Sequence, residues 1–163
     1  AGMSNFQTVI ASSRALNYAD YFLTYTLTVI ILRMFLIRYN GGQNPYRTLA
    51  VLLLIMASSP LLLLFSGSSQ ILYVIVAILF GMGYGTSYPI ISAMAANDAD
   101  KDLTAQTLLV FSFAHFIGVF GFPLVAGWVI VELGIIILLW LVAALAAIEA
   151  GLAFARSYRP RSH

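Results

Sequence analysis

Long apolar stretches separated by short polar joints make up most of the chain. Three of them, residues 48–65, 71–96 and 104–131, contain no Asp, Glu, Lys or Arg, and a fourth, residues 133–155, contains only Glu149. A helix needs about 20 predominantly apolar residues to cross the hydrocarbon core of a bilayer, because each residue adds about 1.5 Å along the helix axis. The four stretches therefore predict four transmembrane helices.

A fifth stretch, residues 18–37, is less apolar. Asp20 and Arg33 bracket an uncharged centre, but both lie near the ends of the stretch, where a side chain can extend to the membrane interface. We therefore predict an all-α, polytopic membrane protein with five transmembrane helices, which form one bundle over residues 18–155.

The composition supports this class. Hydrophobic residues make up 61% of the chain and charged residues 9%, whereas about 25% of the residues in a soluble domain are charged. The net charge of +2 does not indicate nucleic acid as a partner, because the basic residues flank the apolar stretches instead of forming a patch. The chain has no cysteine, which excludes disulfides and thiolate metal sites. We expect no metal, no cofactor and no enzymatic activity.

The basic residues are distributed unevenly between the joints. With five crossings, Arg14 falls on one side of the membrane, and the other Lys and Arg residues fall on the opposite side: Arg33, Arg38, Arg47, Lys101, Arg156, Arg159 and Arg161. Cytoplasmic joints carry the excess of Lys and Arg in membrane proteins. We therefore predict that residues 1–17 are extracytoplasmic and that residues 156–163 form a cytoplasmic tail. The expected location is the bacterial inner membrane.

A chain that starts outside the membrane without an export signal looks like the continuation of a preceding segment. Residues 1–17 have neither a basic start nor an apolar core, so they do not form a cleavable signal peptide. We interpret the chain as N-terminally incomplete, and the alternative is a genuine five-span protein.

Polar side chains recur at helical spacing on two of the predicted helices. Tyr25 belongs to a stripe of Tyr and Thr residues on the first helix, and Tyr84, Ser87 and Tyr88 place hydroxyl groups near the middle of the third. Hydroxyl groups in hydrocarbon need hydrogen-bond partners. These residues therefore either line an aqueous substrate cavity or connect neighbouring helices.

Two ionisable residues lie inside the predicted helices. His115 is a candidate for the same cavity, as a proton relay or a hydrogen-bond partner of the substrate, and ligation of haem or chlorophyll is a further alternative. A neutral His115 bonded to a neighbouring helix fits the sequence equally well. Glu149 lies about two turns before Arg156 on the same helical face. We expect these two side chains to form an ion pair, in preference to a role of Glu149 in ion coupling.

Small residues on three of the predicted helices indicate close helix packing. These residues are Gly81, Gly85, Gly118, Gly121, Ala143, Ala147 and Gly151. A small residue at every fourth position lets two helix backbones approach each other closely. We expect Gly85 and Gly118 to face each other between two helices. The Leu-rich stretch 48–65 has few polar residues, and we expect it mostly to face lipid.

The order of these features resembles the C-terminal half of a major facilitator superfamily transporter, from its eighth to its twelfth helix. Residues 81–96 and the joint 97–102 are similar to the tenth helix and the cytoplasmic loop after it, and residues 111–127 are similar to the Gly-rich eleventh helix. Residues 33–47 occupy the place of the loop between the eighth and ninth helices. Basic residues persist there, but residues 35–37 replace the Gly and Asp of the family motif.

The resemblance implies that the chain is part of a secondary transporter of an unidentified small solute. The solute would bind between the missing N-terminal half and the face that carries Tyr25, Tyr84, Tyr88 and His115, and rocking of the two halves would give alternating access. The expected partners are the lipid bilayer and either the missing N-terminal half or other membrane subunits.

The altered loop and the small-residue stripes also fit a second hypothesis. The chain would then be a transporter-derived structural or assembly subunit of a larger respiratory or photosynthetic membrane complex, without transport activity. Its small residues would serve to dock it against other helices.

Overall fold

The computed structural model describes residues 6–36 and 44–158, and this part of the chain consists of helices with no strand. The helices are α2 (Gln7–Ser13), α3 (Tyr18–Leu36), α4 (Pro45–Phe65), α5 (Gln70–Asp98), α6 (Thr104–Leu133) and α7 (Ile135–Arg156). The predicted all-α class is confirmed. Residues 1–5 of the predicted N-terminal segment, Ile37, Arg38, Arg159 and Arg161 lie outside the described residues.

Within the described ranges, four helices are long and apolar enough to cross a membrane: α4, α5, α6 and α7. These four predicted spans are confirmed in length and composition. Helix α3 covers the fifth predicted stretch, but it is not among the four, and it carries Asp20 in its first turn and Arg33 in its last. A crossing by α3 therefore stays a prediction.

Local sequence signals set the ends of several helices. The side-chain oxygen of Asn44 accepts a hydrogen bond from the backbone N–H of Arg47 at 3.3 Å, and Pro45 occupies the first turn, where a missing N–H is tolerated. Ser69 caps α5 in the same way. Gly134 separates α6 from α7 with a φ of 88°, a conformation that glycine adopts without strain. These caps fix the positions at which the chain turns.

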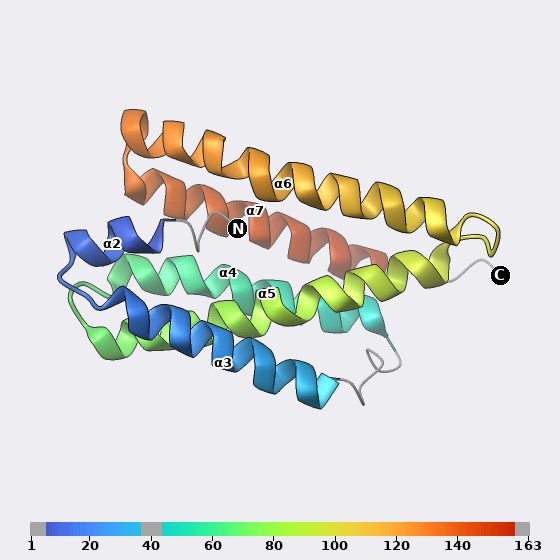
Figure 1. Cartoon of the computed structure of the whole chain (residues 1–163), viewed down its shortest axis with the longest axis horizontal. Coiled ribbons are helices and arrows are strands. Elements are labelled where there is room, and N and C mark those ends of the chain that lie inside the picture. Colours follow the sequence, from blue (N-terminus) through green and yellow to red (C-terminus); the bar gives the residue numbers. More distant parts are fainter. Residues whose placement is uncertain (1–5, 37–43, 159–163) are drawn as a thin grey trace.

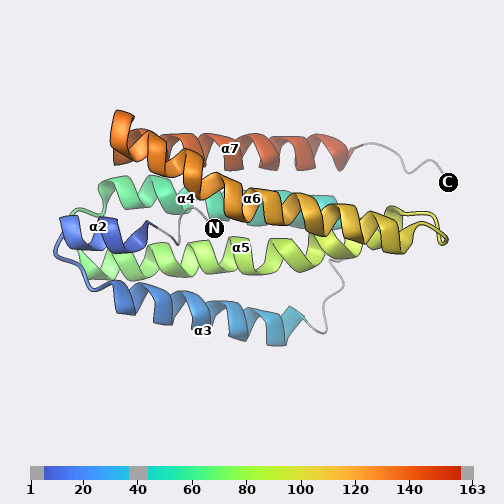
Figure 2. The ribbon, with the colours of Figure 1, turned by 45° about the horizontal axis from the view of Figure 1, so that its top comes forward.

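The long helices lie side by side, and α6 and α7 form an antiparallel hairpin (Figures 1 and 2). Helices α3 and α5 run in one direction, whereas α4 runs in the opposite direction between the same two ends of the bundle. Arg47, Lys101 and Arg156 gather at one end, which we call the basic end, and Arg14 lies at the other. The alternation of the joints between two ends agrees with the sequence, while the assignment of the basic end to the cytoplasm stays a prediction.

Helix α4 lies inside the bundle. It packs along both α5 and α7, and Ser59, Pro60 and Leu63 are fully buried. The hydroxyl of Ser59 donates a hydrogen bond across the interface to the carbonyl of Val76, at 3.2 Å. The expectation that residues 48–65 mostly face lipid is therefore wrong. A Leu-rich surface packs equally well against lipid tails and against another apolar helix, so its composition does not distinguish the two.

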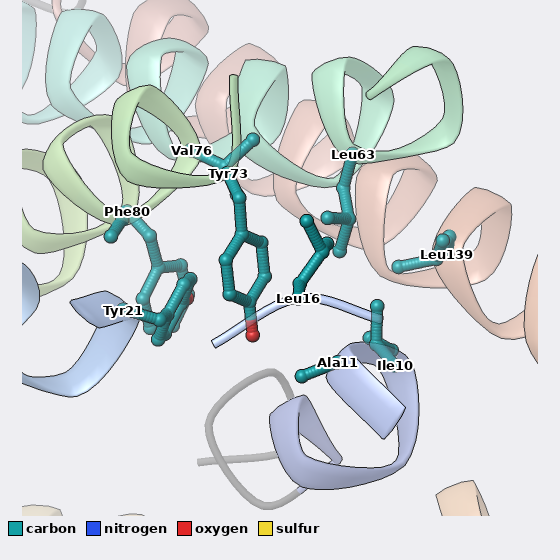
Figure 3. Packing of buried hydrophobic residues seen from close by; sticks show 10 residues of the cluster. Ile10, Ala11, Leu16, Tyr21, Leu63, Tyr73, Val76, Phe80 and Leu139 are labelled. Carbon is teal, nitrogen blue, oxygen red and sulfur yellow. The ribbon is translucent and has the colours of Figure 1, made fainter. Parts of the chain in front are cut away.

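An aromatic cluster anchors α2 on the end of the bundle. The rings of Tyr21 and Tyr73 lie 5.1 Å apart, and the Tyr73 hydroxyl donates to the side-chain oxygen of Gln7 at 2.9 Å. Figure 3 shows Tyr73 reaching from α5 between Tyr21 and Leu16. Arg14 adds hydrogen bonds to the end of α4, at 2.5 Å to the carbonyl of Leu63 and at 2.8 Å to the hydroxyl of Ser66. The predicted extracytoplasmic segment thus contains a short helix that packs on the bundle.

The glycines of α5 bring two helices close to it. A Cβ atom on Gly85 would lie 2.7 Å from a methyl group of Val29 on α3, and one on Gly81 would lie 3.1 Å from Thr28. A Cβ atom on Gly83 would lie 2.8 Å from the carbonyl oxygen of Leu52 on α4. Gly81 and Gly85 therefore lie at a helix contact, as the sequence indicated, but their partner is α3.

The predicted contact between Gly85 and Gly118 is wrong. No atom of another described helix lies within 4 Å of the position that a Cβ atom would take on Gly118, Gly121 or Gly151. These glycines do not bring helices together: Gly118 and Gly121 lie on a part of α6 that stands away from its neighbours, and Gly151 lies on the exposed side of α7. In a membrane, small residues show where helices can approach, but not which helix does.

The small-residue stripe on α7 follows a different register from the predicted one. Ala143, Ala146, Ala150 and Ala153 are buried, whereas Ala147 is exposed, as is Gly151. Steps of three and four residues keep to one side of a helix with 3.6 residues per turn, while repeated steps of four drift away from it. Ala150 and Ala153 pack in one cluster with residues of α4.

Replacement of Gly85 by Leu tests the packing between α3 and α5. The new side chain meets Val29, so we expect a destabilisation of about 1–3 kcal/mol from overpacking. Gly118→Leu is the matched control, because the space beside Gly118 is open. The measurement is thermal unfolding in detergent. A stable Gly85→Leu variant beside an unfolded Gly118→Leu variant would contradict the arrangement of the helices.

Candidate functional site

A hollow of about 330 Å³, which we call the central hollow, lies between α6 and the rest of the bundle. Its lining comes from four helices: Met56 of α4, Phe80 and Tyr84 of α5, His115, Gly118, Val119 and Phe122 of α6, and Val142, Leu145, Ala146 and Glu149 of α7. Sites for small molecules have volumes of about 300–1,000 Å³ and a mostly apolar wall with a few polar groups. The central hollow has this size and character.

The hollow exists because α6 contacts α5 in its first half and α7 near its end. In its first half, the rings of Phe111 and His115 contact Tyr88 of α5, with ring centroids 5.6 Å and 4.6 Å away. Near its end, Ala126 and Val129 pack with residues of α7 in a separate cluster. Between these contacts no neighbouring helix covers α6, so the space beside it stays open.

A second hollow, of about 620 Å³, lies toward the basic end, and we call it the end hollow. Its charged lining residues are Asp98, Glu149 and Arg156. Glu149 lines both hollows, so one carboxylate of α7 lies where the two spaces meet.

The predicted ion pair between Glu149 and Arg156 is wrong. The guanidinium of Arg156 instead lies over the ring of Tyr46, 5.6 Å from its centroid. The Tyr46 hydroxyl donates a hydrogen bond of 2.8 Å to a carboxylate oxygen of Asp98. Cation–π contact with an aromatic ring is a common arrangement for arginine. Among the described residues, Glu149 has no ion pair and no hydrogen bond through its side chain.

The structure brings together part of the predicted substrate face. Tyr84 and His115 line the central hollow, and Tyr88 lies directly behind His115. Tyr25 lies on α3, where its ring packs against Phe80 at 5.7 Å. Tyr84 in turn stacks on the same Phe80 ring at 5.6 Å, which holds its ring in position. Tyr25 therefore belongs to the packing between α3 and α5.

Ser87 is also part of the helix packing. It is buried, and its hydroxyl donates a hydrogen bond of 2.6 Å to the carbonyl of Gly83 on its own helix. The hydroxyl of Thr86 makes the same kind of bond to Met82. Serine and threonine satisfy their polar groups in this way inside apolar helices. These hydroxyls are thus not available to a ligand.

Sequence reasoning missed Glu149 as a cavity residue. The signal was present, since Glu149 is the one acidic residue in an otherwise uncharged stretch, and ionisable groups inside membrane helices commonly face a cavity. The spacing between Glu149 and Arg156 favoured an ion pair. The contact between Arg156 and Tyr46 could not be anticipated, because these two residues lie far apart in the sequence.

His115 lies among aromatic rings. Tyr88, Phe111 and Phe116 have ring centroids 4.6, 6.5 and 6.3 Å from the imidazole. In residues 6–36 and 44–158, no group of three His, Asp or Glu side chains is placed to hold a metal ion. The central hollow is therefore best described as an aromatic space with one carboxylate and one imidazole on its wall.

Comparison with models of known protein families, with curated proteins and with solved structures found no match.

Cysteine labelling tests whether the central hollow holds water. The chain has no cysteine, so an introduced one is the only thiol of this chain. Val119 lines the hollow, whereas its neighbour Phe120 is 69% exposed at the same depth and is not part of the lining. A thiol reacts as the thiolate, which requires water. We expect a water-soluble methanethiosulfonate to modify Val119→Cys much faster than Phe120→Cys in lipid nanodiscs.

Equal and slow modification of both variants would show that lipid fills the central hollow. A reagent that partitions into lipid, applied to the same two variants, provides the control for intrinsic thiol accessibility.

Proposed function

We propose that this chain is part of a secondary transporter of a small solute, arranged like the C-terminal half of a major facilitator superfamily transporter. The observation that carries the proposal is the central hollow, where Tyr84, His115 and Glu149 converge from three different helices. Polar and ionisable groups within a membrane are costly, and in known proteins they mark pathways for substrates and ions.

The pairing of the helices supports the same proposal. Each half of such a transporter consists of two inverted repeats of three helices. If α5, α6 and α7 form the second repeat, then α3 and α4 correspond to α6 and α7. The observed contact between α4 and α7 then lies on the symmetry axis. By the same symmetry, the contact between α3 and α5 has a counterpart on α6. This counterpart is a contact between α6 and a further helix, which is the equivalent of α5 in the other repeat.

The open side of α6 is where that helix would lie. Large apolar side chains of α6 are exposed along this helix, among them Phe113, Phe120, Leu124 and Trp128. A helix from the remaining part of the transporter would cover part of this surface and close the central hollow from the side. The solute would then bind between this helix and the wall that carries Tyr84 and His115.

In this proposal α3 forms the fifth crossing, and the basic end faces the cytoplasm of a bacterial inner membrane. The clustering of Arg47, Lys101 and Arg156 at that end supports the orientation. The end hollow would then be the cytoplasmic exit of the pathway, and rocking between the two halves would open and close it.

The uncovered surface of α6 also favours a second function. No residue in the most apolar 18-residue segment of α6 is buried, so a further membrane subunit could dock against this helix. The chain would then be a structural or assembly subunit of a larger membrane complex. Native purification distinguishes the two, since a subunit co-migrates with its complex at a fixed stoichiometry.

Transport is tested with the protein that the full reading frame encodes, reconstituted in liposomes. We expect accumulation of a solute from a metabolite mixture, measured by mass spectrometry, when a proton or sodium gradient is imposed. Glu149→Gln should reduce the accumulation strongly, since it removes the charge between the two hollows. Glu132→Gln is the matched control, because Glu132 is exposed like Glu149 but lies at the end of α6 and lines neither hollow. No gradient-dependent accumulation of any solute would contradict the proposal.

A further inference from the structure

Glu149 is the only residue with a formal negative charge on the wall of the central hollow, in the part of the chain that the structure describes. No described arginine or lysine lines this hollow. Its side chain is exposed and, among the described residues, has no ion pair and no hydrogen bond, so its charge is not compensated within this part of the chain. The carboxylate therefore faces a space in which a cation would find its counter-charge.

The aromatic residues of the same hollow suit a cation as well. Tyr84 of α5 and Phe122 of α6 line the hollow and are partly exposed, whereas Phe80 is buried and packs against both Tyr25 and Tyr84. The face of an aromatic ring attracts a cation, and it binds quaternary ammonium groups in many proteins. A carboxylate and aromatic rings on the wall of one hollow are a chemistry that recognises an organic ammonium ion.

The other charges of the end hollow do not neutralise Glu149. The end hollow carries two carboxylates, Asp98 and Glu149, and one guanidinium, Arg156. Tyr46 contacts Arg156 through its ring and Asp98 through its hydroxyl, and the arginine forms no ion pair with Glu149. The charges of Asp98 and Arg156 balance each other, so Glu149 carries the uncompensated charge of this lining.

We propose that the central hollow binds a small organic ammonium ion, with Glu149 as its counter-charge and the aromatic rings of α5 and α6 around its alkyl groups. The volume of about 330 Å³ fits a cation of the size of choline or tetraethylammonium. The inference that this cation is the transported substrate rests on the proposed function. The inference that the hollow binds the cation does not.

Isothermal titration calorimetry of the full-length protein in lipid nanodiscs tests the site with two matched probes. Choline and 3,3-dimethylbutan-1-ol have the same shape, but only choline carries a positive charge. We expect saturable binding of choline and affinity about tenfold or more lower for the neutral alcohol. Equal affinity of the two probes would overturn the proposal, because it would show an apolar site without charge recognition.

Variants assign the binding to this hollow. Glu149→Gln should weaken choline binding about tenfold or more, while Glu132→Gln should leave it unchanged. Tyr84→Phe keeps the aromatic face and should retain binding, whereas Tyr84→Leu should weaken it. Thermal unfolding of each variant shows that it is folded. Unchanged choline affinity in folded Glu149→Gln, or no saturable binding of either choline or tetraethylammonium to the folded protein, would overturn the proposal.

The outcomes separate this inference from the proposed function. Choline binding that depends on Glu149, without gradient-driven uptake of any solute, leaves the cation site and removes the transporter. Gradient-driven uptake of another solute, without binding of either ammonium ion, removes the cation site and leaves the transporter.

Discussion

The close packing of α4 between α5 and α7 is the contact on which the other features of the bundle depend. Gly83 of α5 lets the backbone of α4 approach, and the buried alanines of α7 pack against the other side of α4. Small residues replace the hydrophobic effect as the means of association in a membrane, since they allow close van der Waals contact. The three helices therefore form a closely packed centre, and α3 packs against it at Gly81 and Gly85.

The central hollow follows from this centre. Helix α6 is tied to α5 by the rings around Tyr88 and to α7 by the short connection at Gly134, and its glycines have no neighbour to approach. Met56 of α4 and residues of α7 such as Val142 and Leu145 thus form one wall of an open space. The residue that gives this space its chemistry is Glu149, because it brings a charge to a wall that is otherwise mostly apolar.

Much of the fold could be predicted from the sequence. The length of the uncharged stretches predicts the long helices, and the bounds of α5 and α6 differ from the predicted ones by a few residues. The lateral order of the helices could not be predicted. In a soluble protein apolar residues mark the buried face, but in a membrane protein a lipid-facing surface is apolar too. This is why Leu63 was expected to face lipid and is fully buried.

Part of the candidate site could also be predicted from the sequence. Tyr84 and His115 were identified because polar groups are rare in apolar helices, and this signal does not depend on the neighbouring helix. The partners of Gly85 and of Arg156 were not predictable, because Val29 and Tyr46 lie far away in the sequence and only the folded arrangement brings them close.

The central claim is that α5 packs tightly on α3 and leaves a space beside α6. Paired cysteines in this cysteine-free chain measure it most directly. A Cβ atom on Gly85 would lie 3.3 Å from the Cβ atom of Val29, close to the separation of about 3.5–4.5 Å found in disulfides. Mild oxidation should therefore cross-link the pair Val29→Cys and Gly85→Cys, and it should leave the pair Gly85→Cys and Gly118→Cys reduced. Efficient cross-linking of the second pair, with none in the first, would contradict this arrangement of the helices.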